Sequence, residues 1–255
     1  MFALKTDKEI PYLQEESFFD VGARAFFSCR SDSFKKSEKF RSEFYRQQNI
    51  SSENIIQPGQ IHSSIVLLLE KKRHYSSHRP LPADAVMTSC SGAVLQGLFA
   101  DCVPIFIFHP PSGVRVLVHS GWRGTSRGIV KKAISILSER FSVKPEECLA
   151  SIGPAISQKH YEVGKDIFQM FKLRLPKLIA EQGDEFFCRR SGCEKYFLSL
   201  KKANYFLMMK SGMRKDFIEV SDKCTFSHPL LYSYRQEGEQ AGRMIALFDL
   251  FVGRK

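Results

Sequence analysis

One cysteine and two histidines have side chains that could act on a ligand together, although they lie far apart in the chain. They are His62, Cys102 and His119, which are forty and seventeen residues apart. One thiol and two imidazoles form a donor set that suits catalytic zinc, which keeps a fourth coordination position open. The spacing alone leaves a second interpretation open, in which a free cysteine in a buried strand and two unrelated histidines never meet.

A β-hairpin would bring two of these side chains together. An apolar run at residues 105–108 and an extended run at 114–118 flank a short segment that contains Pro and Gly, which is typical of a hairpin. A loop at 110–113 sets Pro104 opposite His119. Because side chains alternate along a strand, Cys102 shares the face of Pro104 and becomes a diagonal neighbour of His119, roughly 7–8 Å away at the backbone.

Other polar groups flank this hairpin. Asp101 adjoins Cys102 and points to the opposite face of the strand, where it could serve as a base, orient a ligand or only carry a surface charge. Residues 121–124 (Gly-Trp-Arg-Gly) open a predicted helix. Backbone N–H groups there and Arg123 could face an anion, and the alternative is a plain turn with Trp122 packed in the core.

Strand and helix patterns alternate irregularly along the chain, which predicts an α/β or α+β protein with sheet enclosed by helices. Apolar residues at helical spacing predict a helix over 129–137, capped by Thr125 or Ser126. Residues 174–194 are predicted to be a linker, and residues 71–82 a surface loop. We expect a single domain over residues 1–255. The predicted strands lie at residues 24–29, 63–69, 83–88, 93–99, 149–152, 218–220, 231–234 and 244–248.

The composition narrows the classes of protein that the chain can belong to. Apolar residues make up 43% of the 255 residues, as in ordinary globular proteins, and no apolar run approaches the roughly 20 residues of a membrane helix. Seven scattered cysteines without a Cys-x-x-Cys pair favour reduced thiols and a cytoplasmic location. The net charge of +11 is spread along the chain, which favours a solvated basic surface over a nucleic-acid site.

Five motifs in order carry a resemblance to a known family. They are Gln-Ile-His at 60–62, Ala-Asp-Cys-Val-Pro at 100–104, His-Ser-Gly-Trp-Arg-Gly at 119–124, Gly-Pro-Ala-Ile at 153–156 with Tyr-Glu-Val-Gly at 161–164, and Cys-Thr at 224–225 with Tyr-Ser-Tyr-Arg at 232–235. With these motifs the chain resembles the bacterial laccase-domain family, also called multicopper polyphenol oxidoreductases, over residues 26–247. Members are described as purine nucleoside phosphorylases with adenosine deaminase activity, and one branch as a peptidoglycan editing factor.

The resemblance implies a fold and a metal. The fold would be one α/β domain, a sandwich of mixed β-sheet enclosed by helices. The ligands would be His62, Cys102 and His119, holding Zn²⁺, with Cu²⁺ as a substitute. Multicopper centres are rich in His-x-His pairs, and the chain has none. We therefore expect any polyphenol oxidation to be an incidental result of copper in the zinc site.

The resemblance also implies a reaction. Phosphate would attack the ribose of adenosine, inosine or methylthioadenosine and release the purine. In a second reaction, a zinc-activated water would remove the amino group of adenosine. The expected partners are thus a purine nucleoside and phosphate, with no membrane. The residues assigned to the reaction are Cys102, His119 and Asp101 as catalytic groups, and Arg30, Arg123 and Gln60 as substrate-binding groups.

The chain departs from the family pattern at three places. The family has a glycine-rich turn and a longer segment after the position of Arg30, where this chain has a shortened, charged stretch. Ser157 stands where a glycine is usual, and His160 stands where a cysteine is frequent. The first departure leaves the substrate contacts of that segment open.

Two other functions remain in competition with the nucleoside phosphorylase. The first is a peptidoglycan editing amidase that acts on UDP-muramyl precursors, in which Cys102 and His119 form a nucleophilic pair instead of ligating a metal. The second is a polyanion binder without catalysis, whose affinity would fall steeply with salt. The oligomeric state does not follow from the sequence.

Overall fold

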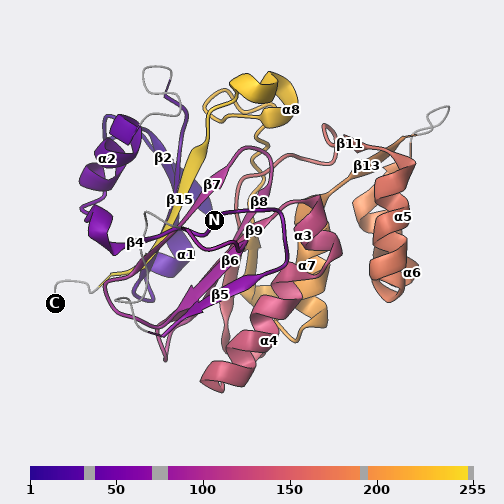
Figure 1. Ribbon diagram of the computed structural model, residues 1–255, viewed down its shortest axis with the longest axis horizontal. Helices are drawn as coiled ribbons and strands as arrows, with labels where there is room; N and C mark the ends of the chain where they lie inside the picture. The colour runs from indigo at the N-terminus through magenta and orange to yellow at the C-terminus, as the bar shows by residue number, and fades with distance from the viewer. Residues whose placement is uncertain (32–37, 71–79, 190–194, 252–255) are drawn as a thin grey trace.

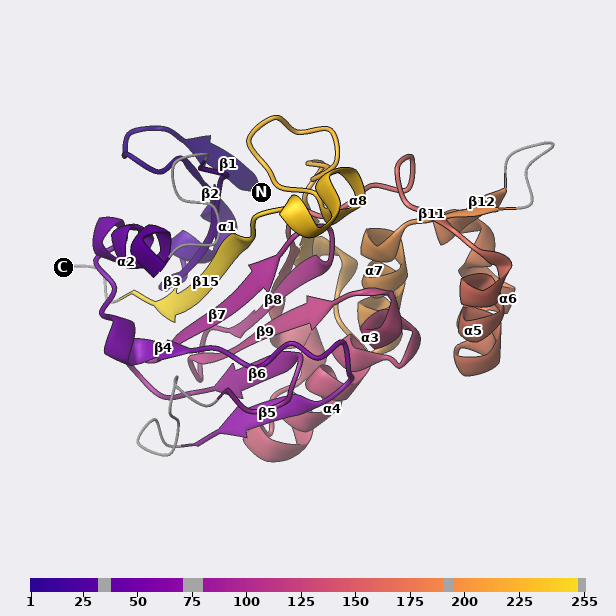
Figure 2. The same ribbon diagram turned by 45° about the horizontal axis from the view of Figure 1, so that its top comes forward.

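The computed structural model describes residues 1–31, 38–70, 80–189 and 195–251, and contains two six-stranded mixed sheets (Figures 1 and 2). The first sheet has the order β1-β2-β3-β15-β7-β4. Neighbouring strands in this sheet run antiparallel, except for β4 and β7, which are parallel. In that order its strands are Phe2–Lys5, Tyr12–Glu15, Ala23–Ser28, Met244–Leu250, Val94–Phe99 and Ile55–Ile56.

The second sheet has the order β14-β10-β8-β9-β6-β5, with parallel pairs at both of its edges. The central pair β8 and β9 forms the predicted hairpin, in which Pro104 lies opposite His119 and His109 opposite Val114. In that order its strands are Ile218–Val220, Leu149–Ile152, Val103–His109, Val114–Ser120, Ala85–Thr88 and Val66–Leu69.

Strand β8 is apolar over most of its length because both of its faces are covered. Phe106 and Phe108 point between the two sheets and pack with Phe248 of β15. Ile105 and Ile107, one position out of phase, point to the opposite face and join the core beneath the helices. Because side chains alternate along the strand, β8 contributes apolar residues to two layers of the core. One layer lies between the sheets, and the other lies between the second sheet and its helices.

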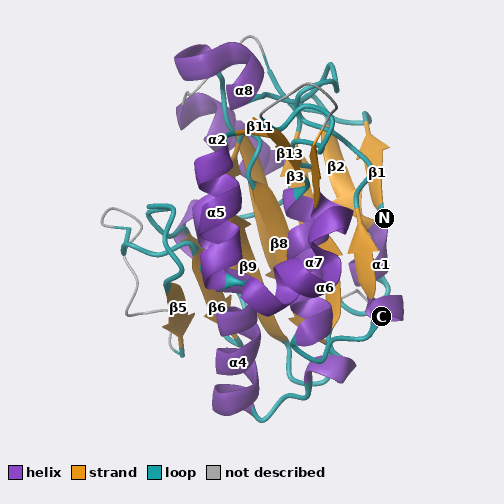
Figure 3. Cartoon of the chain, turned by 90° about the vertical axis from the view of Figure 1, so that its right-hand side faces the viewer, coloured by secondary structure: helices purple, strands orange, loops and turns teal. Residues whose placement is uncertain are grey.

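Helices cover the outer faces of both sheets. Helix α2 (Glu38–Gln47) packs its aromatic residues on the first sheet, and α4 (Ile129–Phe141) and α7 (Leu200–Lys210) cover the second, as Figure 3 shows. Beyond them lie α5 (Lys165–Arg174) and α6 (Pro176–Phe186). A small antiparallel sheet adjoins these last two helices, with the order β11-β13-β12 and the bounds Glu162–Val163, Tyr196–Leu198 and Phe187–Arg189.

The structure confirms the α/β fold class, but three local predictions are wrong. Thr125 and Ser126 do not cap α4. They lie in a short helix, α3 (Trp122–Ser126), where their hydroxyl groups donate to carbonyls of residues 121 and 123. Gly128 precedes α4 instead, with a φ of 68° in the left-handed region that glycine adopts without strain.

The predicted linker at 174–194 contains helix α6 and strand β12, since Pro176 is well suited to the first position of a helix. The predicted strand at 231–234 is also wrong. Ser233 accepts a hydrogen bond from the backbone N–H of Gln236 and caps a short helix, α8 (Tyr234–Glu237). The N-terminal pair β1 and β2 was not predicted, and most of the predicted surface loop at 71–82 lies outside the described residues.

None of the helices in the described ranges is both long and apolar enough to cross a bilayer. All cysteines that the structure describes are free thiols, as the sequence predicts.

Candidate metal centre and the cavity around it

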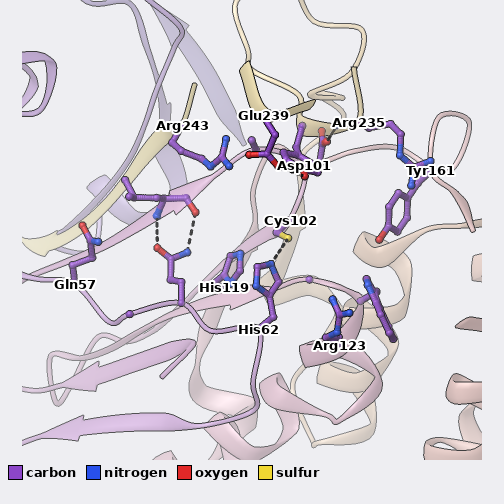
Figure 4. Close-up of a pocket in the computed structure, with 17 residues that line it drawn as sticks. Gln57, His62, Asp101, Cys102, His119, Arg123, Tyr161, Arg235, Glu239 and Arg243 are labelled. Atoms are coloured by element: carbon purple, nitrogen blue, oxygen red, sulfur yellow. Dashed lines mark hydrogen bonds between the residues drawn. The ribbon is translucent and has the colours of Figure 1, made fainter. Parts of the chain in front are cut away.

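The donor atoms of His62, Cys102 and His119 lie together, all within 4.8 Å of one another. The Cys102 sulfur is 4.0 Å from Nε2 of His62, and the two imidazole rings are 5.0 Å apart at their centres. Figure 4 shows the three side chains directed toward a common point. The hairpin register places His119 there, because it lies one residue before the end of β9 and opposite Pro104, two residues after Cys102. The fold thus brings together the residues that the sequence singled out.

A buried carboxylate holds the two histidines. Oδ1 of Asp84 is 2.9 Å from the backbone nitrogen of His62 and 2.9 Å from Nδ1 of His119. Its second oxygen accepts from the backbone N–H (2.6 Å) and the hydroxyl (2.7 Å) of Ser63. Since a carboxylate only accepts, Nδ1 of His119 carries the hydrogen and Nε2 is left for the cavity. This is the carboxylate–histidine arrangement found behind metal ligands.

His62 lies on an irregular segment whose backbone is held from both sides. The φ values of Gln60 and His62 are 49° and 58°, in the left-handed region that costs side chains of this kind roughly 1–3 kcal/mol. The Gln60 amide donates to the carbonyl of Leu98 and accepts from its N–H, each at 2.8 Å. These bonds and the Asp84 carboxylate offset the strain and fix the position of His62.

Gly121 leaves room for the three donors. A Cβ at this position would lie 2.9 Å from the Cys102 sulfur and 3.3 Å from Cδ2 of His62. The donor atoms of a tetrahedral zinc site are roughly 3.3–3.8 Å apart, so small side-chain rotations would bring this cluster to that geometry. The residues present therefore fit a thiophilic divalent ion such as zinc.

The electrostatics of the cluster favour a thiolate. Burial raises the pKa of the Cys102 thiol, but the charges and hydrogen bonds of His119 and His62 outweigh it and lower the pKa to about 6. Burial lowers the pKa of His119, but Cys102 and Asp84 outweigh it and raise the pKa to about 9. Burial also acts to raise the pKa of Asp84, and bonds from His119 and Ser63 lower it overall. A thiolate is the form that binds metals and the form that attacks electrophiles.

The cluster forms part of the wall of a cavity of about 730 Å³. Arg123 and Arg235 lie over the rings of Trp122 and Tyr161, at 4.4 and 4.9 Å from the ring centres. The cavity therefore combines positive charge, aromatic surface and hydrogen-bonding groups. Besides the three donors, its polar and aromatic lining residues are Gln57, Gln60, Asp101, Trp122, Arg123, Tyr161, Tyr234, Arg235, Glu239 and Arg243 (Figure 4).

A family model described as "Multi-copper polyphenol oxidoreductase laccase" matches residues 24–250. The chain belongs to this laccase family. A purine nucleoside phosphorylase of Bacteroides thetaiotaomicron is 27% identical over 240 residues, covering 88% of this chain and 85% of that protein. The purine nucleoside phosphorylase YlmD of Geobacillus stearothermophilus is 32% identical over 173 residues, covering 68% of this chain. That match spans 60% of the length of YlmD.

Two solved structures share the fold of this laccase-family chain. YlmD from Geobacillus stearothermophilus superposes with a TM-score of 0.86 at 23% identity, covering 99% of this chain and 100% of that one. The Bacillus licheniformis hypothetical protein YfiH gives 0.85 at 22% identity, covering 97% and 98%. At these identities the likeness shows the fold, and it confirms the predicted α/β architecture.

The family description speaks of several coppers, whereas the donors in this chain form a single cluster. Within residues 1–31, 38–70, 80–189 and 195–251, the one group of three or more His, Cys, Asp or Glu side chains that could hold a metal is His62, Cys102 and His119. One three-donor site matches a mononuclear centre.

Three of the four other predicted site residues line the cavity. Asp101 and Arg123 line the cavity, and so does Gln60, whose amide is engaged with the Leu98 backbone. Arg30 does not line it. The Arg30 guanidinium pairs with Glu237 at 3.5 Å and lies 4.9 Å from the centre of the Tyr232 ring. A direct contact between Arg30 and substrate stays a prediction, and the ion pair with Glu237 joins Arg30 to helix α8.

Asp101 is held firmly at the cavity rim. Its φ of 86° is in the left-handed region, and its carboxylate accepts from the Thr225 hydroxyl and the Arg235 N–H, each at 2.6 Å. Its carbonyl accepts from the N–H of Ile156 at 3.1 Å. Asp101 thus joins the turn before β8 to helix α8 and to the segment after β10. A role in proton transfer stays a prediction.

Sequence reasoning missed Asp84, Glu239 and Arg243, and it assigned no role to Arg235, although that residue ends the fifth motif. Asp84 could have been found as the charged residue within an otherwise apolar predicted strand, where a buried carboxylate needs partners. The other three lie on α8 and the segment after it, and no spacing pattern connects them to the hairpin.

Proposed function

We propose that the chain is a zinc-dependent purine nucleoside phosphorylase that works in the cavity around His62, Cys102 and His119. Membership of the family and relatives named purine nucleoside phosphorylase support the reaction class. The observation that carries the proposal is that one cavity of about 730 Å³ is lined by the donor cluster, three guanidinium groups and aromatic rings. A nucleoside and a phosphate are the ligands that such walls suit.

The guanidinium groups supply the phosphate site. Arg123 is exposed at the cavity and stacks on Trp122. Arg235 donates to the carbonyl of Glu162 at 2.8 Å, and Arg243 to the carbonyls of residues 241 and 242, each at 2.9 Å. A guanidinium keeps further N–H groups after such bonds and can bind phosphate bidentately. A phosphate held there attacks the anomeric carbon of ribose, and the bond from that carbon to the purine nitrogen breaks.

Other residues of the cavity wall bind the nucleoside and supply the proton that the departing purine needs. The ring of Tyr161 is suited to stacking on a purine, and Glu239 to accepting hydrogen bonds from ribose hydroxyls. The purine leaves with the electron pair of the glycosidic bond and needs a proton. Asp101 is our candidate for moving this proton, since each of its oxygens retains a lone pair after bonding Thr225 and Arg235. Gln60 shapes the wall beside His62.

His62, Cys102 and His119 would hold the metal. Zinc bound there would supply a Lewis acid that lowers the pKa of a water, which is the chemistry required by the proposed additional adenosine deaminase activity. We propose adenosine, inosine and methylthioadenosine as substrates. Copper bound by the same ligands would account for incidental polyphenol oxidation.

Phosphate-dependent release of hypoxanthine from inosine tests the proposal. Purified protein with a full complement of zinc is assayed with and without phosphate, beside Arg123→Gln and Arg243→Gln. We expect release only with phosphate, and a rise of about 10–100-fold in the KM for phosphate in each variant, because each loses a charge-assisted hydrogen bond. Arg214→Gln, an exposed residue outside the cavity, is the matched control. Absence of hypoxanthine from the zinc-loaded protein contradicts the proposal.

A second candidate function follows from the position of Asp84. Asp84, His119 and Cys102 also form the orienting acid, base and nucleophile of a cysteine hydrolase, as a peptidoglycan editing amidase would need. Excess chelator separates the two functions, because a hydrolase of this kind keeps its activity when the metal is removed and the phosphorylase loses it. Amidase activity on a UDP-muramyl peptide that survives chelation would favour this second candidate.

A further inference from the structure

A second thiol, Cys224, lies in a polar cluster behind the cavity wall. It follows β14 and pairs with Ala155 in an isolated parallel bridge. Its sequence neighbour Thr225 donates to Asp101, and the neighbour of His160 is the cavity residue Tyr161. The proposed phosphorylase chemistry makes no use of this thiol.

Hydrogen-bond donors surround the Cys224 sulfur. The backbone nitrogen of Ser157 lies 3.3 Å away and Nδ1 of His160 lies 3.4 Å away. The Ser157 hydroxyl is 3.2 Å from the same Nδ1. The imidazole is held flat against the ring of Phe226, with centres 4.5 Å apart and an interplanar angle of 14°. The donors are therefore fixed in place around the sulfur before any ligand arrives.

A buried cation lies close by. Lys201 of α7 is 8% exposed, and its ammonium donates to the carbonyls of Ser221 and Lys223 at 2.6 and 3.1 Å. Burial lowers the pKa of Lys201, and the charge of Cys224 acts to raise it. Burial raises the pKa of the Cys224 thiol, but the bonds from Ser157, His160 and the Ser227 backbone outweigh it and lower the pKa to about 6.

Two other buried thiols show how the surroundings of Cys224 change the pKa of a cysteine. Cys29 and Cys148 are buried among apolar residues, and burial raises the pKa of each to about 12. They are inert in the way that buried structural cysteines are. Cys224 is only partly buried and has donors on several sides.

We propose that Cys224 is a reactive thiolate that forms a mixed disulfide with low-molecular-weight disulfides, at a site separate from the metal centre. The thiolate sulfur attacks one sulfur of the disulfide, and the bond between the two sulfurs of the reagent breaks. A bond forms between Cys224 and the attacked sulfur, and the other half leaves as a thiolate that takes its proton from solvent. The disulfide is the oxidant, so the step balances without another reactant.

The position of Cys224 connects this modification to the cavity. A group attached to the sulfur displaces the contacts with Ser157 and His160, which precede Tyr161. It also crowds Thr225, which holds the Asp101 carboxylate, and through it the Arg235 N–H at the start of α8. Modification therefore lowers turnover by moving the cavity wall, and this consequence rests on the proposed function.

Peptide mapping of the zinc-loaded protein with glutathione disulfide as the probe tests the thiol chemistry without an activity assay. We expect Cys224 to be modified about tenfold faster than Cys188 at pH 6, where the gain in thiolate fraction outweighs the lower nucleophilicity of a low-pKa thiolate, although Cys188 is the more exposed thiol. His160→Phe keeps a ring to stack on Phe226 and removes the nitrogen, and it should slow modification of Cys224 by about two- to fivefold at this pH. Equal rates at the two cysteines of the wild type, or an unchanged rate in His160→Phe, would overturn the proposal.

Turnover of the modified protein tests the connection to the cavity separately. Hypoxanthine release is measured before modification, after it, and after reduction, with Cys224→Ser as the control that cannot react. We expect a loss that a thiol reductant reverses in the wild type and no loss in Cys224→Ser. Full turnover by the modified wild type would overturn the connection. If the unmodified enzyme releases no hypoxanthine, the proposed function fails while the mapping still decides the reactivity of Cys224.

Discussion

Two of the three proposed ligands depend on the Asp84 carboxylate. Its Oδ1 accepts from the His62 backbone and from the His119 imidazole. One oxygen atom therefore fixes the position of the loop that carries His62 and the orientation of the His119 ring. The neighbouring oxygen is saturated by Ser63. A metal site loses affinity when its ligands are free to rotate. We therefore expect Asp84 to affect metal affinity, although it is not itself a proposed ligand.

Replacing Asp84 with asparagine tests this role. The amide supplies one acceptor oxygen and one donor nitrogen, so it cannot accept all of these bonds. We expect zinc affinity to fall by about 10–100-fold, the usual effect of losing an outer-shell partner. Competition with a chromophoric chelator measures the change. Asp216→Asn, at an exposed position remote from the cavity, is the control, and unchanged affinity in Asp84→Asn contradicts the assigned role.

Metal binding should release protons in a pH-dependent way. A ligand histidine must be neutral and a ligand cysteine ionised. With the pKa of His119 at about 9, the metal displaces one proton from this residue below pH 9, and zinc affinity should rise by about tenfold per pH unit between pH 6.5 and 8.5. Below the Cys102 pKa of about 6 a further proton adds to the slope. Zinc titrations at several pH values measure the slope. A zinc affinity that does not change with pH would contradict the assignment of His119 and Cys102 as ligands.

Helix α8 is the element that completes the cavity. It is only four residues long, too short to be stable by itself. It is held by the Ser233 cap, by the ion pair of Glu237 with Arg30, and by the bond from its Arg235 N–H to Asp101. The wall that carries Arg235 therefore depends on contacts with residues distant in the sequence, Arg30 and Asp101.

Thr225→Val tests how firmly this wall is held. Valine has the same shape but removes the buried hydroxyl that donates to Asp101 at 2.6 Å. Leaving that buried carboxylate oxygen without its donor should lower the free energy of unfolding by about 1–3 kcal/mol. Urea unfolding measures the loss. Thr6→Val, at an exposed position, should leave the stability within about 0.5 kcal/mol, and equal effects of the two changes would contradict the assignment.

The molecule as a whole is a sandwich whose sheets share one core. Phe106 and Phe108 of the second sheet pack on Phe248 of the first. Neither sheet can expose this face to water without losing roughly 25 cal/mol for each Å² of apolar surface. This shared core supports the prediction of a single domain.

Thermal unfolding followed by two probes tests the single domain. Trp122 is the only tryptophan and reports on the start of α3 beside the cavity, whereas far-ultraviolet circular dichroism reports on all elements. If the domain is single, the two transitions have the same midpoint and width. An earlier fluorescence transition would show that the cavity side unfolds independently.

The local pattern was sufficient for the central elements. The apolar run at Ile105–Phe108 and the loop at residues 110–113 predicted the β8–β9 register correctly, and helical spacing predicted α4. Prediction failed where local patterns were weak or ambiguous. Ser233 could end a strand or cap a helix, and Gly183, a residue typical of loops, lies inside helix α6. The motifs also carried the resemblance to the family, which the family match confirms.

The sequence by itself determined which side chains could bind a metal and which hairpin would bring Cys102 toward His119, because hairpin register is a local property of strands and turns. Only the tertiary structure decided that Asp84 supports both histidines, that Arg235 and Arg243 face the same cavity, and that Arg30 pairs with Glu237 of α8. The physical reason is that these contacts join segments distant in the sequence. Such contacts form through packing of the two sheets and leave no periodic pattern along the chain.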